Sequence, residues 1–134
     1  MRISFSGTRR GMSPWQLQQL EDLIKARCPD GFSHGSCVGA DVQAHALVRR
    51  IFGQRTFIAV FPSTAPTKAP VPPDANFVAV AKPPLERNPD IVDWGCDLLV
   101  AAPLQMREVV RSGTWSAIRY ARKRKIPVEI LWRD

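Results

Sequence analysis

Short runs of apolar and β-branched residues alternate along this chain with longer stretches in which apolar residues recur every three or four positions. The short runs have the length and composition of β-strands, and they lie at residues 2–6, 32–34, 56–61, 97–102 and 128–132. The longer stretches have the period of helices with one buried face, and they lie at residues 14–27, 40–53, 88–94 and 114–124. Strands that alternate with helices in this way predict a parallel sheet.

Two local signals support this assignment. Ser13 precedes Pro14 and Gln16, which is the pattern of a capped helix start with a capping box. The run at 56–61 is apolar throughout, which is typical of a strand buried on both faces of a parallel sheet. With right-handed crossovers, we predict an α/β fold: a single doubly wound, Rossmann-like domain, with a mainly parallel sheet of about five strands and helices on both faces.

The size and composition of the chain suit one domain. The sequence has 134 residues, of which 45% are hydrophobic, and this is enough for a core of ordinary size. We therefore expect residues 1–134 to form a single domain. Twelve residues are proline, and the proline-rich segment at 62–84 is predicted to be mainly loop, with a short extended piece at 77–80. This segment is too short to separate two domains, so we expect it to border the functional site or to cover it.

The chain is strongly basic, with a formal net charge of +7 and a pI of about 10.0. A basic domain attracts anions such as nucleotides, nucleic acids and acidic lipids. Part of the excess positive charge lies in residues 119–125. We interpret this run as the end of a helix, where cations interact favourably with the helix dipole. A patch that binds nucleic acid is the alternative.

The three cysteines, Cys28, Cys37 and Cys96, are odd in number and have no CxxC spacing. This pattern argues against a disulfide framework and favours a reducing compartment. The N-terminal residues lead directly into a predicted strand and show no signal peptide. No apolar run approaches the roughly 20 residues that a membrane-spanning helix needs. We therefore predict a cytoplasmic protein without a membrane partner.

Three loops that follow predicted strands carry small and polar residues, at 6–9, 35–41 and 111–116. In doubly wound folds, ligands bind at the carboxyl ends of the strands, where such loops meet. Glycine lets backbone N–H groups approach a ligand, a helix N-terminus adds positive charge, and an arginine can bind phosphate with two hydrogen bonds. We predict a phosphate-bearing ligand. The candidate binding residues are Ser6, Gly7, Thr8, Arg9, Gly35, Ser36, Cys37, Gly39, Asp41, Ser112, Gly113, Thr114 and Ser116.

Two other kinds of site have to be weighed in the same region. Cys37, Asp41 and His45 lie four residues apart, hence on one helical face, and His34 is near them, which is a spacing that can hold zinc. We interpret these residues instead as a buried cysteine, a capping aspartate and a surface histidine, because a second dense pair of metal ligands is missing. We predict neither a metal nor a cofactor. A nucleophilic pair of Cys37 and His34 is a further alternative.

Four motifs together resemble the SLOG superfamily, which joins the DNA-processing A (Smf) proteins with the LOG phosphoribohydrolases. The motifs are Ser6-Gly7-Thr8-Arg9, His34-Gly35-Ser36-Cys37-Val38-Gly39-Ala40-Asp41, Arg87-Asn88 and Ser112-Gly113-Thr114. The likeness spans nearly the whole chain, which looks like the stand-alone YpsA-like branch. The resemblance implies a nucleotide site built by these loops and a homodimer.

The resemblance also implies candidate catalytic residues. LOG enzymes split the N-glycosidic bond of nucleoside 5′-monophosphates with an arginine and a glutamate. Arg87 matches the position of that arginine, and Gly113-Thr114 matches part of the family motif. Ala117 stands where the glutamate is expected. Asp41 and Glu86 are the carboxylates that would have to replace it.

These observations predict a domain that binds a phosphate-bearing nucleotide or nucleotide derivative at the carboxyl edge of its sheet, as a sensor or processing domain. The first alternative is an N-glycosidase that acts on nucleoside 5′-monophosphates. The second alternative is a protein that binds single-stranded nucleic acid through its basic surface.

Overall fold

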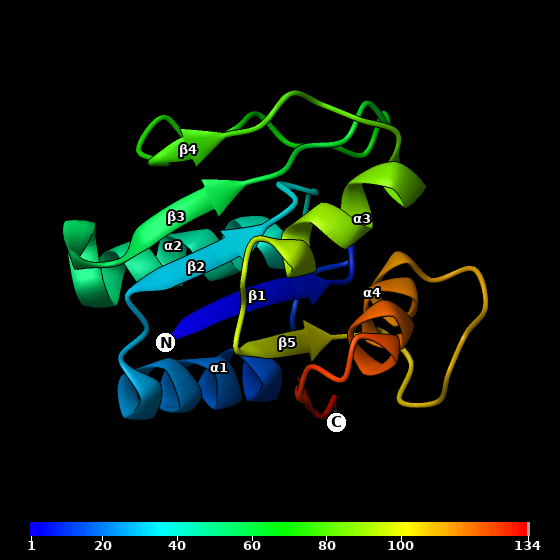
Figure 1. The fold of residues 1–134 in the computed structure, drawn as a ribbon. Coiled ribbons are helices and arrows are strands. Elements are labelled where there is room, and N and C mark those ends of the chain that lie inside the picture. Colours follow the sequence, from blue (N-terminus) through cyan, green and yellow to red (C-terminus); the bar gives the residue numbers. More distant parts are fainter. Residues whose placement is uncertain (134) are drawn as a thin grey trace.

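The computed structural model describes residues 1–133 and contains one sheet flanked by helices (Figure 1). The elements within these residues are β1 (Arg2–Gly7), α1 (Pro14–Arg27), β2 (Gly31–His34), α2 (Ala40–Phe52), the 3-10 turn η1 (Gly53–Arg55), β3 (Phe57–Val60), β4 (Phe77–Val78), α3 (Pro84–Asp93), β5 (Leu98–Ala102), α4 (Gly113–Lys123) and β6 (Val128–Ile130).

All neighbouring strands of the sheet are parallel, in the order β4-β3-β2-β1-β5-β6. The chain first builds outward from β1 to β4 and then returns to add β5 on the other side of β1 (Figure 1). Strand β6 follows next to β5 at that edge. The winding direction therefore reverses between β1 and β5, and the loops that leave these two strands diverge. In open α/β sheets this reversal point is where ligands bind.

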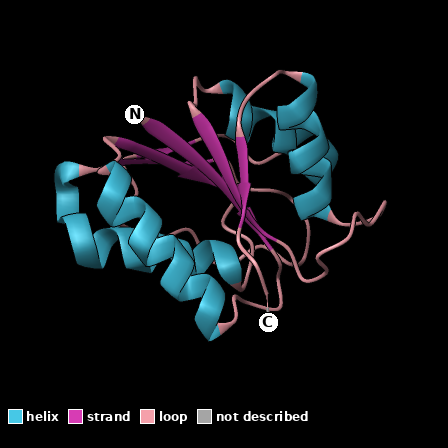
Figure 2. Cartoon of the chain, turned by 90° about the horizontal axis from the view of Figure 1, so that it is seen from below, coloured by secondary structure: helices cyan, strands magenta, loops and turns pink. Residues whose placement is uncertain are grey.

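Helices α1 and α2 pack on one face of the sheet, and helices α3 and α4 pack on the other (Figure 2). The larger core lies under α1 and α2, where Leu20, Ile24 and Val48 pack against Phe5 and Phe32 of the central strands. All five side chains are fully buried. Burial of a large apolar side chain stabilises a fold by about 1.5–3 kcal/mol, so these residues explain why the central strands and the first two helices assemble.

The second core lies on the opposite face, under α3 and α4. Trp115 and Ile118 of α4 and Val92 of α3 pack against Leu99 and Ala101 of β5. The two residues of β5 alternate with Leu98 and Val100, which face the first core, so β5 is buried on both sides. This arrangement fixes the start of α4 next to the carboxyl end of β5.

The predicted fold class is confirmed, and the structure adds detail at the element ends. The capping box at the start of α1 is present: Ser13 Oγ accepts a hydrogen bond from the Gln16 N–H at 3.1 Å, and Gln16 Oε1 accepts one from the Ser13 N–H at 3.1 Å. The extended piece within the proline-rich segment joins the sheet as β4, a sixth strand. Helix α3 begins at Pro84 and not at residue 88, because proline is well accommodated in the first turn of a helix. No helix within residues 1–133 is long and apolar enough to cross a membrane.

Candidate ligand-binding site

A cavity of about 420 Å³ lies at the carboxyl ends of the central strands, at the point where the winding reverses. Residues from the loops after β1, β2 and β5 form its wall, together with the start of α3 and of α4. Ten of the predicted site residues contribute to it: Ser6, Gly7, Thr8, Arg9, Cys37, Asp41, Arg87, Ser112, Gly113 and Thr114.

The other five predicted residues lie outside the cavity wall. Gly35 and Gly39 bring chain segments together: a Cβ at Gly35 would overlap the guanidinium of Arg87, and one at Gly39 would overlap the backbone of the loop after β1. Ser36 is fully buried behind the wall. Ser116 lies within α4, where its N–H donates to a backbone carbonyl, and Glu86 is exposed on α3.

Asp41, in the first turn of α2, ties two loops together. Its carboxylate accepts hydrogen bonds from the N–H groups of Gly35 at 3.1 Å, Cys37 at 3.2 Å and Gly7 at 3.3 Å. Burial raises the pKa of this carboxyl to about 6, against the opposing effect of the hydrogen bonds and of Arg87. Among residues 1–133, Asp41 is the one acidic residue in the cavity wall, and its oxygens accept hydrogen bonds from the backbone.

Arg87 joins α3 to the ends of β2 and β3. Its Nη1 donates to the carbonyls of Gly35 at 2.7 Å and Phe61 at 2.9 Å, and its Nε donates to Asn88 Oδ1 at 3.0 Å. Its Nη2 lies 3.5 Å from Cys37 Sγ. We call Cys37, Asp41 and Arg87 the tied wall of the cavity, because hydrogen bonds within the protein hold each of them.

A second group of wall residues has polar groups with few protein partners. Within residues 1–133, the side chains of Arg9, Arg10 and Arg111 form no ion pair or hydrogen bond, and the N–H groups of Gly113 and Thr114 at the start of α4 have no acceptor. Thr114 is 5% exposed and lines the cavity. We call these five residues the donor wall.

The sequence analysis missed several wall residues. Arg10 and Arg111 directly adjoin predicted site residues. The positive charge of these loops is the signal that could have indicated them. Ser63 and Thr67 come from the proline-rich segment, which was expected to border the site without a residue assignment. The position of this segment is set by backbone hydrogen bonds such as the one from the Val38 N–H to the Thr67 carbonyl, at 3.0 Å. Hydrophobic periodicity in the sequence does not predict contacts of this kind.

The structure does not bring together the residues of the alternative zinc site or of the alternative Cys37–His34 nucleophilic pair. His45 was expected at the surface, and this is wrong: it is 3% exposed and lies between His34 and Asp74. Among residues 1–133 no group of three His, Cys, Asp or Glu side chains is arranged to hold a metal ion. Neither ring nitrogen of His34 contacts Cys37, and burial raises the pKa of that thiol.

Fold and site together define a Rossmann-like α/β protein with a cavity at the carboxyl edge of a parallel sheet. The chain matches no family model and no curated protein. Among solved structures it is similar to the molybdenum cofactor binding protein from the phototrophic bacterium Rippkaea orientalis. That similarity has a TM-score of 0.68 and 20% sequence identity, and it covers 96% of this chain and 74% of that chain.

Proposed function

We propose that this protein binds a phosphate-bearing nucleotide or nucleotide derivative in the cavity. The observation that carries the proposal is the donor wall, where three arginines and two backbone N–H groups at a helix start belong to residues that line the same cavity. Such N–H groups and arginines are the common partners of phosphate oxygens. The phosphate would lie between the loop after β1 and the start of α4.

The rest of the cavity suits a ring system. Ile91, Leu104 and Val109 contribute apolar surface to the wall. The volume of about 420 Å³ lies within the range of small-molecule sites. We therefore expect the phosphate at the donor wall and a flat, largely apolar group at these three side chains.

Binding is favoured over hydrolysis of an N-glycosidic bond by the carboxylates near the cavity. Asp41 accepts three backbone hydrogen bonds, and Glu86 is exposed outside the wall. Ala117, at the position where the LOG pattern has its glutamate, is buried within α4. A general acid beside the leaving group would therefore have to be Asp41. In that role, Asp41 would have to give up hydrogen bonds by which it holds the two loops together.

The similar protein from Rippkaea orientalis is described as a molybdenum cofactor binding protein. That description supports a small-molecule ligand for the corresponding fold here. It makes the molybdenum cofactor a ligand to be tested beside nucleotides, as one member of a panel.

Calorimetric titration tests the proposal with inorganic phosphate, AMP, adenosine and the molybdenum cofactor. We expect AMP to bind at least about tenfold more tightly than adenosine, because charge-assisted hydrogen bonds to phosphate contribute about 1.5–3 kcal/mol each. Arg111→Met should weaken AMP binding about tenfold. Arg122→Met is the matched control, because Arg122 is exposed on α4 outside the cavity wall, and it should leave binding unchanged.

Four outcomes would contradict the proposal or favour one of its alternatives. Equal affinity for AMP and adenosine, or no binding of any phosphate-bearing ligand, would contradict it. Chromatography of the same mixture would detect free adenine released from AMP, and such release would establish the hydrolase alternative. Binding of oligonucleotides that falls steeply with salt would favour the nucleic-acid alternative.

A further inference from the structure

A buried row of side chains connects the loop after β2 with the proline-rich segment. Ser36 N–H donates to His34 Nδ1 at 3.0 Å. His34 Nε2 lies 2.8 Å from His45 Nδ1, and His45 Nε2 lies 2.6 Å from Asp74 Oδ1. His34 is fully buried and His45 is 3% exposed, whereas the side chain of Asp74 is 44% exposed.

The contacts of this row fix the direction of every hydrogen bond in it. A backbone N–H can only donate, so His34 Nδ1 is an acceptor and the proton of the neutral ring is on Nε2. His34 therefore donates to His45 Nδ1, and this places the proton of His45 on Nε2, from which it donates to Asp74. Both imidazoles are held in the Nε2–H tautomer, and the row ends on a carboxylate.

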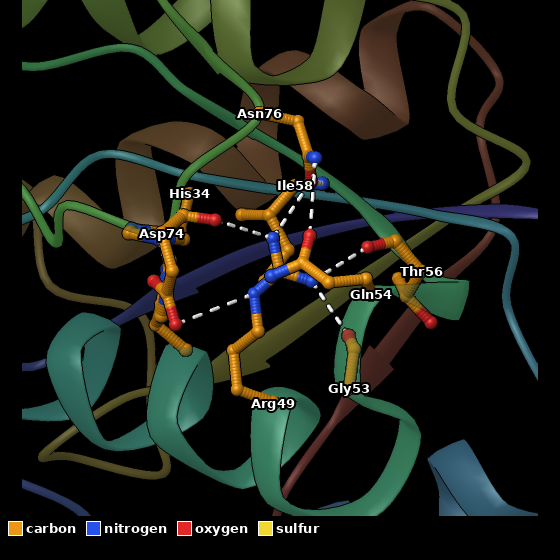
Figure 3. A network of polar contacts seen from close by, with 9 residues as sticks. His34, Arg49, Gly53, Gln54, Thr56, Ile58, Asp74 and Asn76 are labelled. Atoms are coloured by element: carbon orange, nitrogen blue, oxygen red, sulfur yellow. Dashed lines mark hydrogen bonds and ion pairs between the residues drawn. The ribbon is translucent and has the colours of Figure 1, made fainter.

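The charged groups around the row favour this arrangement. Burial lowers the pKa of His34 to about 3, with further contributions from His45 and Arg87, so the ring is neutral. At the other end, Arg49 of α2 holds Asp74 in place (Figure 3): its Nε lies 3.5 Å from Asp74 Oδ2, and its Nη2 donates to the Asp74 carbonyl at 2.7 Å.

Arg49 is itself anchored by three further acceptors. Its Nη1 donates to the carbonyls of Gly53 at 2.7 Å and Thr56 at 2.8 Å, and its Nη2 donates to Asn76 Oδ1 at 2.7 Å (Figure 3). The carboxylate end of the row is therefore fixed to the end of α2 and to the edge of the sheet.

The loop end of the row is a backbone that needs to be held. Ser36 has a φ of 53°, in the left-handed region that residues other than glycine seldom adopt. Its hydroxyl is buried with no hydrogen-bond partner in the described part of the chain. Such a conformation persists only where its surroundings fix it. The consecutive N–H groups of Gly35, Ser36 and Cys37 are bound in turn by Asp41, His34 and Asp41.

We propose that His34, His45 and Asp74 are positioning residues, which hold the loop at 35–37 and thereby set the tied wall of the cavity. Their effect on the loop is independent of any ligand. Their effect on ligand affinity rests on the proposed function, because a displaced Cys37 and Asp41 would change the shape of the cavity that is proposed to hold the phosphate. The row is the mechanical link between the exposed proline-rich segment and the cavity.

The tautomers test the row in the ligand-free protein. Long-range ¹H–¹⁵N NMR should show both imidazoles as Nε2–H tautomers, and His34 should remain neutral from about pH 8 to about pH 5, although a free histidine titrates near 6.5. An Nδ1–H tautomer in either ring, or charging of His34 near pH 6.5, would overturn the proposal.

Two variants at Asp74 separate positioning from general stability. Asp74→Ala removes the terminal acceptor at a half-exposed position, whereas Asp74→Asn keeps an oxygen that can accept from His45. We expect the hydrogen-exchange protection of the Ser36 N–H to fall about tenfold or more in Asp74→Ala and to stay within about threefold of the wild type in Asp74→Asn. Equal loss of protection in both variants, or no loss in either, would contradict the proposal.

A second pair addresses the middle of the row. His45→Asn places an acceptor near the position of Nδ1, and His45→Leu does not, so the hydrogen-exchange protection of the Ser36 N–H should be kept in His45→Asn and lost in His45→Leu. AMP affinity should fall about threefold in Asp74→Ala and recover in Asp74→Asn. If the wild type binds no AMP while the tautomers are as expected, the proposed function fails and the row stands. If AMP binds and the tautomers differ, the row fails alone.

Discussion

The two walls of the cavity use their polar groups in opposite ways. In the tied wall, Asp41 and Arg87 make their hydrogen bonds to the backbone of neighbouring loops. In the donor wall, Arg9 and Arg111 line the cavity together with the start of α4, and their side chains make no hydrogen bond or ion pair within residues 1–133. The comparison teaches that the most buried ionisable groups of this site are structural, and that the groups available to a ligand are the exposed ones beside them.

The largest difference should appear when a methyl group is added to Gly39, in the segment that carries Cys37 and Asp41 of the tied wall, or to Gly113 of the donor wall. Gly39 has a φ of 91°, and a Cβ there would overlap the backbone of Arg9, whereas a Cβ at Gly113 would meet nothing within 4 Å. We expect Gly39→Ala to lower the free energy of unfolding by about 2–4 kcal/mol and Gly113→Ala to change it by less than about 1 kcal/mol. Urea unfolding measures both values, and similar losses in the two variants would mean that the walls are equally rigid.

Arginine truncation should separate stability from binding. Arg87→Met leaves the carbonyls of Gly35 and Phe61 without their donor, so the free energy of unfolding should fall by about 1–3 kcal/mol. Arg111→Met should leave stability within about 0.5 kcal/mol of the wild type and should weaken AMP binding. Thermal unfolding and calorimetry on the same samples provide the test. A loss of stability in Arg111→Met, or none in Arg87→Met, would reverse the assignment of the walls.

The buried ionisable groups at and behind the tied wall should also affect how the free energy of unfolding depends on pH. The pKa of Asp41 is raised from 3.8 to about 6, so its contribution to stability is present below pH 3.8 and is lost as pH rises through about 6. The pKa of His34 is lowered from 6.5 to about 3, so its contribution is present above pH 6.5 and is lost as pH falls toward 3. Between these limits the two groups oppose each other.

Removal of the Asp41 carboxyl should therefore make the pH dependence due to His34 measurable. In Asp41→Asn, the free energy of unfolding should fall by about 2 kcal/mol between pH 6.5 and pH 5. The reason is that His34 becomes protonated in the unfolded chain over this interval, whereas the buried ring of the folded protein stays neutral. The wild type should change less over the same interval. Urea unfolding at a series of pH values measures the two slopes. The same slope in both proteins would show that Asp41 does not titrate as described.

The smallest expected effect concerns the cap of α4. Ser112 Oγ accepts a hydrogen bond from the Trp115 N–H at 3.2 Å, so Ser112→Ala should cost about 0.5–1 kcal/mol. Ser13→Ala in the capping box of α1 is the matched comparison, and it should cost more because that cap makes two hydrogen bonds. Thermal unfolding of the two variants checks the order, and a larger loss at Ser112 would place the start of α4 among the rigid parts of the molecule.

The sequence was sufficient for the alternation of strands and helices, because the buried faces of α1, α2 and α4 repeat at helical period. It also indicated the loops of the cavity, because glycine, serine and arginine gather after predicted strands. It indicated an extended piece at 77–80, but not that Phe77 and Val78 would pair with β3 as a sixth strand, because this pairing depends on tertiary contacts.

The roles within the site were harder to predict than its location. Arg87 and Asp41 have the residue types of catalytic groups, but their hydrogen bonds to distant backbone atoms depend on how the loops fold against each other. The row from His34 through His45 to Asp74 joins three segments of the chain, and no spacing in the sequence connects Asp74 with the two histidines. The surface position expected for His45 was wrong for the same reason.

Binding of phosphate at the donor wall is tested most directly by ¹H–¹⁵N correlation spectra recorded while AMP is added to the wild-type protein. The largest shifts should occur at the amides of Arg9, Arg10, Gly113 and Thr114, and adenosine at the same concentration should not reproduce them. Shifts confined to the basic end of α4, at residues 119–125, or no shifts at millimolar AMP would contradict a phosphate site in this cavity.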